Sequence, residues 1–126
     1  MDEDIRVLEN IKFQCEEILK SLKRHKLSPE VLSDDIIFYN GCCGTIFEIG
    51  EQAKRLSKEY CRKHPEVKWK YIIQNRDKIG HHYGDLNVKI IWNTINTDIP
   101  ILLKHCIAGI EELKTEKSGK NKVEKG

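Results

Sequence analysis

The fold is decided by the stretch Asp4-Ile5-Arg6-Val7-Leu8-Glu9-Asn10-Ile11-Lys12-Phe13-Gln14-Cys15-Glu16-Glu17-Ile18-Leu19-Lys20-Ser21-Leu22-Lys23-Arg24. Its apolar residues recur at steps of three and four positions, at Ile5, Leu8, Ile11, Cys15, Ile18, Leu19 and Leu22. This spacing is that of an amphipathic helix over about residues 4–24, with one face turned towards a core. The chain lacks the strict alternation of apolar and polar residues that is typical of half-buried strands. The sequence therefore predicts an all-α fold.

Two helix-start signals follow this first helix. Ser28-Pro29-Glu30 places Ser at the N-cap and Pro at the first helical position. Ser33-Asp34-Asp35 forms a second signal, from which we expect a long helix towards Tyr60. Gly41-Cys42-Cys43-Gly44 lies within it, where each interior Gly costs about 1 kcal/mol. We expect these glycines to serve close packing or to mark a local break, and the two cysteines to be small packing groups.

The second half of the chain predicts two more helices. Pro65 ends the long helix, because it pushes the preceding residue out of the helical conformation. A short helix is expected over residues 69–80, closing near Gly80, and a last helix begins at Val88. Pro100 falls inside that last pattern and predicts a kink or a restart near Asp98. The expected architecture is a bundle of four to five helices.

The charge of the chain is unevenly distributed. Its 126 residues hold 22 Lys and Arg against 20 Asp and Glu, a net charge of +2. Residues 115–126 account for this excess, with four Lys against two Glu, and we expect them to form a basic, disordered tail after a single domain over residues 1–114. Residues 54–78 are locally basic, with nine Lys and Arg against three acids. Such a segment is compatible with either a solvated helix face or a phosphate-bearing ligand at one site.

Several classes of protein are excluded by composition and motifs. No apolar run approaches the roughly 18 residues of a membrane span, so no membrane partner is expected. The acidic N-terminus is unlike a secretory signal, and the five Cys follow no disulfide pattern, so we expect a cytoplasmic protein. The chain has no glycine-rich phosphate loop and no serine nucleophile motif.

Groups that can carry chemistry crowd the stretch Arg-Asp-Lys-Ile-Gly-His-His-Tyr over residues 76–83. A helix that ends at Gly80 would let His81 swing back towards Arg76. A guanidinium provides a permanently charged fork for phosphate oxygens, and an imidazole exchanges protons near neutral pH. This pair suits phosphodiester chemistry and requires no metal or other cofactor. The alternative is a helix end decorated with polar residues.

Metal binding is a competing use of these groups. Cys61 and His64, together with His81 and His82, are zinc-ligand types. Structural zinc sites usually have two close pairs of ligands, and only one short pair is present here. His25 and His105 stand alone at helical positions, and Tyr39, Tyr60 and Tyr71 are interpreted as packing residues.

Arg76-x4-His81-x-Tyr83 resembles the signature of the HepT-like toxins, which are HEPN-domain ribonucleases paired with a minimal nucleotidyltransferase (MNT) antitoxin. Residues 49–57, 64–69, 88–94 and 98–100 resemble further segments of the family in the same order. Two positions depart from its pattern. Gly80 stands where an apolar residue is common, and His82 where Gly is common, so His82 could share the role of His81.

The resemblance implies an all-α HEPN homodimer that cuts RNA without a metal ion, as the toxin of a type VII HEPN/MNT toxin–antitoxin pair. In it His81 would be the general acid/base and Arg76 would bind phosphate, with Asp77 and His82 in support. The MNT antitoxin would transfer AMP to Tyr83 and so block RNA binding. The alternative function is a non-catalytic HEPN dimer that binds nucleotide or scaffolds a nucleotidyltransferase.

Overall fold

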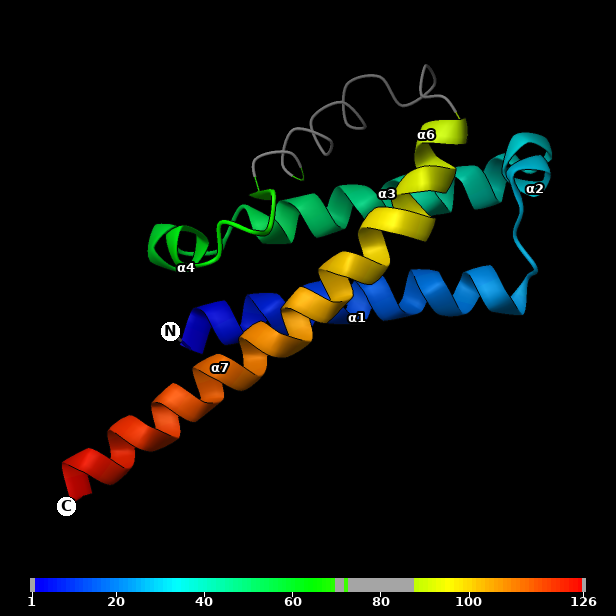
Figure 1. Cartoon of the computed structure of the whole chain (residues 1–126). Helices are drawn as coiled ribbons and strands as arrows, with labels where there is room; N and C mark the ends of the chain where they lie inside the picture. Colours follow the sequence, from blue (N-terminus) through cyan, green and yellow to red (C-terminus); the bar gives the residue numbers. More distant parts are fainter. Residues whose placement is uncertain (1, 70–71, 73–87, 126) are drawn as a thin grey trace.

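The computed structural model describes residues 2–69, 72 and 88–125, and over these residues it contains helices and no strand (Figure 1). The expected all-α fold is thereby confirmed. The elements are α1 (Asp2–Arg24), α2 (Pro29–Asp34), α3 (Ile36–Ala53), α4 (Lys58–Lys63), α6 (Val88–Asn93), the π-helix η1 (Thr94–Asp98) and α7 (Ile99–Lys125). Within the described ranges, no helix is both long enough and apolar enough to span a membrane.

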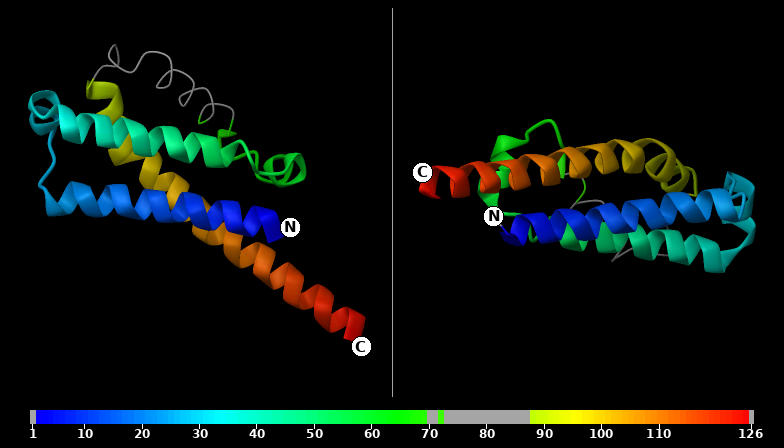
Figure 2. Two further views of the ribbon diagram at one scale, coloured as in Figure 1. Left: turned by 180° about the vertical axis from the view of Figure 1, so that it is seen from behind. Right: turned by 90° about the horizontal axis from the view of Figure 1, so that it is seen from below.

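Helix α1 is the centre of the packing. It lies beside α3, which runs in the opposite direction, and α7 crosses it diagonally (Figures 1 and 2). The short α2 packs against α3 and α6 and so closes one end of the bundle. These contacts follow from the amphipathic pattern of α1, whose apolar face must be covered on more than one side.

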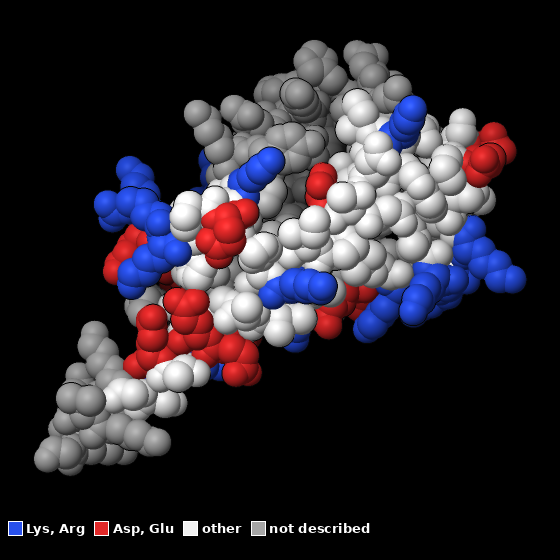
Figure 3. All heavy atoms as spheres, viewed as in Figure 1, with Lys and Arg blue, Asp and Glu red and all other residues white. Residues whose placement is uncertain are grey.

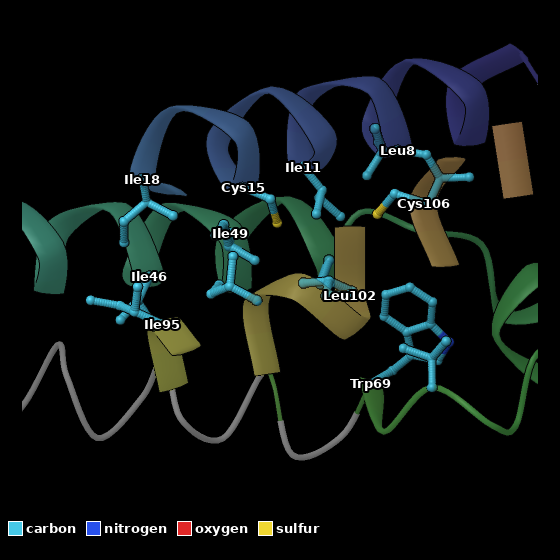
Figure 4. Close-up of a cluster of buried hydrophobic side chains, with 14 of the residues drawn as sticks. Leu8, Ile11, Cys15, Ile18, Ile46, Ile49, Trp69, Ile95, Leu102 and Cys106 are labelled. Atoms are coloured by element: carbon cyan, nitrogen blue, oxygen red, sulfur yellow. The ribbon is translucent and has the colours of Figure 1, made fainter. Parts of the chain in front are cut away.

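The core lies where α1, α3 and the α6–η1–α7 segment meet (Figure 4). The periodic residues of α1 that predicted the helix supply its wall, since Leu8, Ile11 and Cys15 are completely buried. Cys42 and Cys43 of α3 are also buried, which confirms that they are packing groups. Burial in this apolar setting raises the pKa of the Cys42 thiol to about 11, so that thiol is protonated near neutral pH.

The first turn of the chain is built from backbone hydrogen bonds. At the end of α1, the N–H of Leu27 donates to the Leu22 carbonyl and that of Lys26 to the Lys23 carbonyl. This is the Schellman arrangement, and it places Lys26 in the left-handed region with φ of 48°. Ser28 then caps α2 by accepting from the N–H of Val31, as the sequence predicts.

The long helix expected to reach Tyr60 is shorter than predicted. It begins at Ile36, with Asp35 as its N-cap, and ends at Ala53. A separate α4 starts after Ser57, whose Oγ caps the helix by accepting from the N–H of Tyr60. The buried Asp4 of α1 accepts hydrogen bonds from the Ser57 N–H at 2.8 Å and from the Ser57 Oγ at 2.7 Å. The helix is continuous through the Gly41–Gly44 stretch, and nothing lies within 4 Å of a Cβ built on Gly41. Close packing therefore does not explain that glycine.

The final helix has the interruption that Pro100 predicts. Proline has no N–H and its ring excludes the carbonyl four residues earlier, so the turn before it cannot keep the α pattern. Here the Ile99 N–H donates instead to the Thr94 carbonyl, which makes 94–98 a π-helical turn. Beyond it α7 continues to Lys125, through a stretch whose composition predicts disorder. Its Lys and Glu residues are good helix formers.

Candidate functional site

The residues that the sequence singles out for chemistry lie outside the described residues. This holds for Arg76, Asp77, His81, His82 and Tyr83, and for most of the short helix expected over 69–80. The structure nevertheless describes both approaches to them. The chain enters this segment from α4 and the turn around Pro65, and it re-enters the described region at α6.

The described residues that follow α4, up to Trp69 and Ile72, are firmly packed. Trp69 and Tyr60 are both buried, with ring centroids 6.1 Å apart, so the packing role expected of Tyr60 is confirmed. The Trp69 N–H donates to the Val67 carbonyl at 2.9 Å, and the Ile72 N–H donates to the Lys68 carbonyl at 3.1 Å. The indole Nε1 of Trp69 is buried without a hydrogen-bond partner among the described residues. Four positions before Arg76 in sequence, the backbone is therefore still fixed against the core.

A cavity of about 490 Å³ opens between this approach and the start of α7. The residues that line it in the described part of the chain are Glu66, Val67, Lys68, Ile72, Asp98, Ile101, Leu102 and His105. In Figure 3 the surface is hollowed beside the upper part of α7, with an acidic side chain at the edge of the hollow. Its volume lies within the range of about 300 to 1,000 Å³ that is usual for small-ligand sites.

The pKa values of the two carboxylates that line this cavity are shifted in opposite directions. A hydrogen bond from its own backbone N–H lowers the pKa of Glu66. Burial raises this pKa, whereas His64 and His105 lower it further. Partial burial raises the pKa of Asp98, and this shift is opposed by the positive charge of Lys68. Glu66 is thus held in its charged form by close partners, whereas Asp98 faces the cavity without a hydrogen bond or an ion pair to another described residue.

His64 joins this region to α7. Its ring stacks on the buried ring of Tyr60, with centroids 4.4 Å apart, and its side chain is only 14% exposed. Nδ1 lies 3.2 Å from Glu66 Oε1, and Nε2 lies 3.4 Å from Glu112 Oε2 on α7. Glu66 Oε1 is also 4.0 Å from Nδ1 of His105. Two histidines that looked unrelated in the sequence are therefore connected through one carboxylate.

The zinc alternative includes His81 and His82, which lie outside the described residues. The described residues contain no group of three or more His, Cys, Asp or Glu side chains placed to hold a metal ion. Cys61, which precedes His64 by three positions, has a pKa raised by burial and by the charge of Asp4.

Comparison with known proteins decides the family. The sequence profile of the family described as ribonuclease HepT-like matches residues 9–108, which include both the described bundle and the segment around Arg76. The chain belongs to the HepT-like ribonuclease family. This membership confirms the resemblance drawn from the sequence and supports a ribonuclease function.

Individual relatives of this HepT-like chain agree with that assignment. A candidate RNase of Caldanaerobacter subterraneus subsp. tengcongensis is 38% identical over 97 residues, which cover 77% of this chain and 85% of the relative. A protein of Thermococcus cleftensis named as a probable ribonuclease HepT is 39% identical over 54 residues, or 43% of this chain and 49% of its own. A candidate RNase of Methanocaldococcus jannaschii is 35% identical over 68 residues, or 54% of this chain and 56% of its own. No solved structure matches the chain.

The locally basic segment of this HepT-like chain is partly visible at the surface. Lys and Arg side chains gather over α4 and the loop before it (Figure 3). Those of the described residues, all exposed, are Lys54, Arg55, Lys58, Arg62 and Lys63, and the exposed Lys68 follows α4. They lead along the chain directly to the cavity, because Glu66 and Lys68 follow α4 within a few residues.

Asp98, Glu66 and His105 were not among the site residues predicted from the sequence. Asp98 and His105 are brought to residues 66–68 by the crossing of α7, across 30 to 39 positions of sequence. A signal was nevertheless present at Pro100, because π-helical turns are frequent at functional sites. The interruption it predicts ends at Asp98, which lines the cavity.

Proposed function

We propose that this chain is a metal-independent endoribonuclease, the toxin of a HEPN/MNT toxin–antitoxin pair. The observation that carries the proposal is the family match over residues 9–108, which surrounds an intact Arg76-x4-His81-x-Tyr83 set. The basic surface over α4 supports an RNA substrate, since phosphate contacts dominate binding to nucleic acid.

Within this proposal two side chains carry the reaction. His81 transfers the proton to or from the reacting hydroxyl groups, and Arg76 binds the phosphate and stabilises the charge that develops in the transition state. Asp77 and His82 support them, Asp77 as a neighbour of the guanidinium and His82 as a second imidazole. Proton transfer and charge stabilisation together suffice for RNA cleavage, because the 2′-hydroxyl of RNA is itself the nucleophile.

The proposed partner is a minimal nucleotidyltransferase that transfers AMP from ATP to the hydroxyl of Tyr83, with release of pyrophosphate. The added phosphate group is bulky and anionic, and Tyr83 is only two positions from His81. It would repel and obstruct the RNA backbone at the point of cleavage.

A homodimer is part of the same proposal. Ile36 and Ile37 are exposed at the start of α3, although α3 also supplies buried residues to the core. Exposed apolar side chains on a helix that is otherwise packed are suited to contact with a second copy. The mass of the particle in solution, measured by light scattering, tests this part.

The function is tested with purified chain, single-stranded RNA and EDTA. We expect cleavage in the presence of the chelator, and its loss on His81→Ala and on Arg76→Lys, because Lys retains the charge but not the bidentate fork. His25→Ala is the matched control, since His25 lies in the turn after α1 and should leave cleavage unchanged. Wild-type rates in His81→Ala would refute the catalytic assignment.

The modification is tested by intact mass after co-expression with the partner. A mass increase equal to one or more AMP units is expected for the wild-type chain and none for Tyr83→Phe. An undiminished increase in Tyr83→Phe would place the modification on another residue and contradict this part of the proposal.

A further inference from the structure

The cavity between residues 66–72 and the start of α7 has two chemically distinct parts. Val67 and Leu102 are buried, and with Ile72 and Ile101 they provide an apolar wall. Glu66, Lys68, Asp98 and His105 provide a polar rim. An apolar wall with a few convergent polar groups is the usual construction of a site for a small organic group. None of these residues has a role in the cleavage proposed above.

In the described part of the chain, the rim favours a neutral occupant over a phosphate. Among the described residues it presents two carboxylates, one ammonium group and one imidazole. Glu66 is stabilised in its charged form by its own N–H and by His64 and His105, so it repels an anion at any pH near neutrality. The occupant that fits is neutral, flat enough to lie on the apolar wall, and able to donate hydrogen bonds to a carboxylate.

We propose that this cavity binds one base of a single-stranded RNA and prefers a base with an exocyclic amino group. The inference rests on the proposed ribonuclease function. Carboxylate oxygens accept from the amino group of cytosine, whereas uracil presents a carbonyl oxygen at the same position. Asp98 is assigned as the acceptor, because it lines the cavity and Glu66 Oε1 already lies 3.2 Å from Nδ1 of His64.

Two further contacts follow from the geometry. The ring of His105 is one-third exposed beside the cavity and offers a face on which a base can stack. Lys68 stands at the rim and continues the basic surface of α4, where the phosphates on either side of the bound base would lie. The base and its backbone are thus received by different surfaces, one slightly acidic and one basic.

The proposal is tested by binding, with the His81→Ala chain so that RNA is not consumed. Cytidine 5′-monophosphate, uridine 5′-monophosphate and inorganic phosphate are titrated separately and followed by calorimetry and by the methyl NMR signals of Ile101 and Leu102. We expect the cytidine nucleotide to bind about fivefold or more tightly than the uridine nucleotide. Phosphate alone should leave the two methyl signals unmoved.

A matched pair of variants locates the site. Ile101→Trp fills the cavity from a position that is 54% exposed, so it should fold normally and weaken cytidine monophosphate binding about tenfold or more. Ile107→Trp makes the same change on the same helix, at a 44% exposed position that does not line the cavity, and should change affinity less than about twofold. Equal effects of the two variants would overturn the proposal.

Two more measurements complete the test. Asp98→Asn replaces a carboxylate with an amide that both donates and accepts, so the preference for cytidine over uridine should fall to within about twofold. A tetracytidylate strand should displace the monophosphate from the wild-type cavity. Retention of the full preference in Asp98→Asn, or failure of the strand to displace the nucleotide, would overturn the proposal.

The outcomes separate this proposal from the proposed function. If His81→Ala abolishes RNA cleavage but Ile101→Trp leaves nucleotide binding unchanged, the ribonuclease function is supported and the base site is refuted. Conversely, the wild-type chain could fail to cut RNA and still bind nucleotide. If Ile101→Trp then abolished that binding, the base site would stand and the proposed ribonuclease function would be refuted.

Discussion

Gly109 is the point at which the interior of the bundle tolerates no additional atom. A Cβ built there overlaps the Tyr60 Oη and lies 3.2 Å from Tyr60 Cζ and 3.3 Å from Leu8 Cδ1. Tyr60 is 4% exposed and stacked on His64, and Leu8 is completely buried. Neither side chain can withdraw without disturbing its own neighbours. We therefore expect Gly109→Ala to destabilise the fold.

The magnitude follows from two opposing effects. Overpacking in a core typically costs about 1 to 3 kcal/mol, while Ala in a helix interior is about 1 kcal/mol more favourable than Gly. The expected net loss in the free energy of unfolding is about 1 kcal/mol. Gly41→Ala is the matched control, because it makes the same substitution within α3 where nothing lies within 4 Å. It should stabilise the protein by about 1 kcal/mol, since only the helix preference acts.

The assay is urea unfolding followed by circular dichroism, applied to both variants and to a double-mutant cycle with Tyr60→Phe. Removal of the tyrosine hydroxyl relieves the closest contact, so Gly109→Ala should cost less in the Tyr60→Phe background by about 1 kcal/mol. The reasoning is refuted if Gly109→Ala is as stable as Gly41→Ala, or if the cost of Gly109→Ala is the same in both backgrounds.

Three further outcomes are expected. Lys26→Gly should raise the free energy of unfolding by about 1 kcal/mol, because Lys26 has φ of 48° and glycine adopts that conformation without strain; a decrease in thermal melting temperature would contradict this. Asp4→Ala should lower the free energy of unfolding by about 2 kcal/mol in the same urea assay, since both hydrogen bonds from Ser57 to a buried carboxylate are lost. Because the pKa of Glu66 is lower in the folded state than its ordinary value of 4.5, its charged form stabilises the fold at pH values above 4.5. This stabilisation is lost as the pH falls through the lower pKa of the folded state. Glu66→Gln should therefore reduce the loss of stability below about pH 4.5, seen as a flatter plot of urea midpoint against pH.

Local signals were sufficient to predict where most helices begin. The period of α1 and the Ser28-Pro29 start both appear in the structure because they rest on interactions between residues a few positions apart. The break after Ala53 was missed for the opposite reason. Ser57 caps α4 locally, but it is held by hydrogen bonds to Asp4, 53 positions away, and no local pattern records that pairing.

The same distinction applies to the candidate site. Arg76, His81 and Tyr83 are recognisable in the sequence because their signature is compact, and their assignment remains a prediction outside the described residues. The cavity could not be predicted, because Asp98 and the residues before Ile72 meet only once α7 has crossed the bundle. Periodicity identifies which face of a helix is apolar, but it does not give the angle at which two helices cross.

Pro100 links the fold to this cavity. The buried residues Ile91, Ile95 and Ile99 recur at steps of four, and in a regular α-helix two such steps rotate the third residue about 80° away from the first. The π-helical turn absorbs this rotation, because its hydrogen bonds span five residues instead of four. All three isoleucines can therefore face the core, and the helix resumes in register with Leu102 and Cys106. The wider turn keeps the core closed while its last residue, Asp98, remains at the surface as a wall of the cavity.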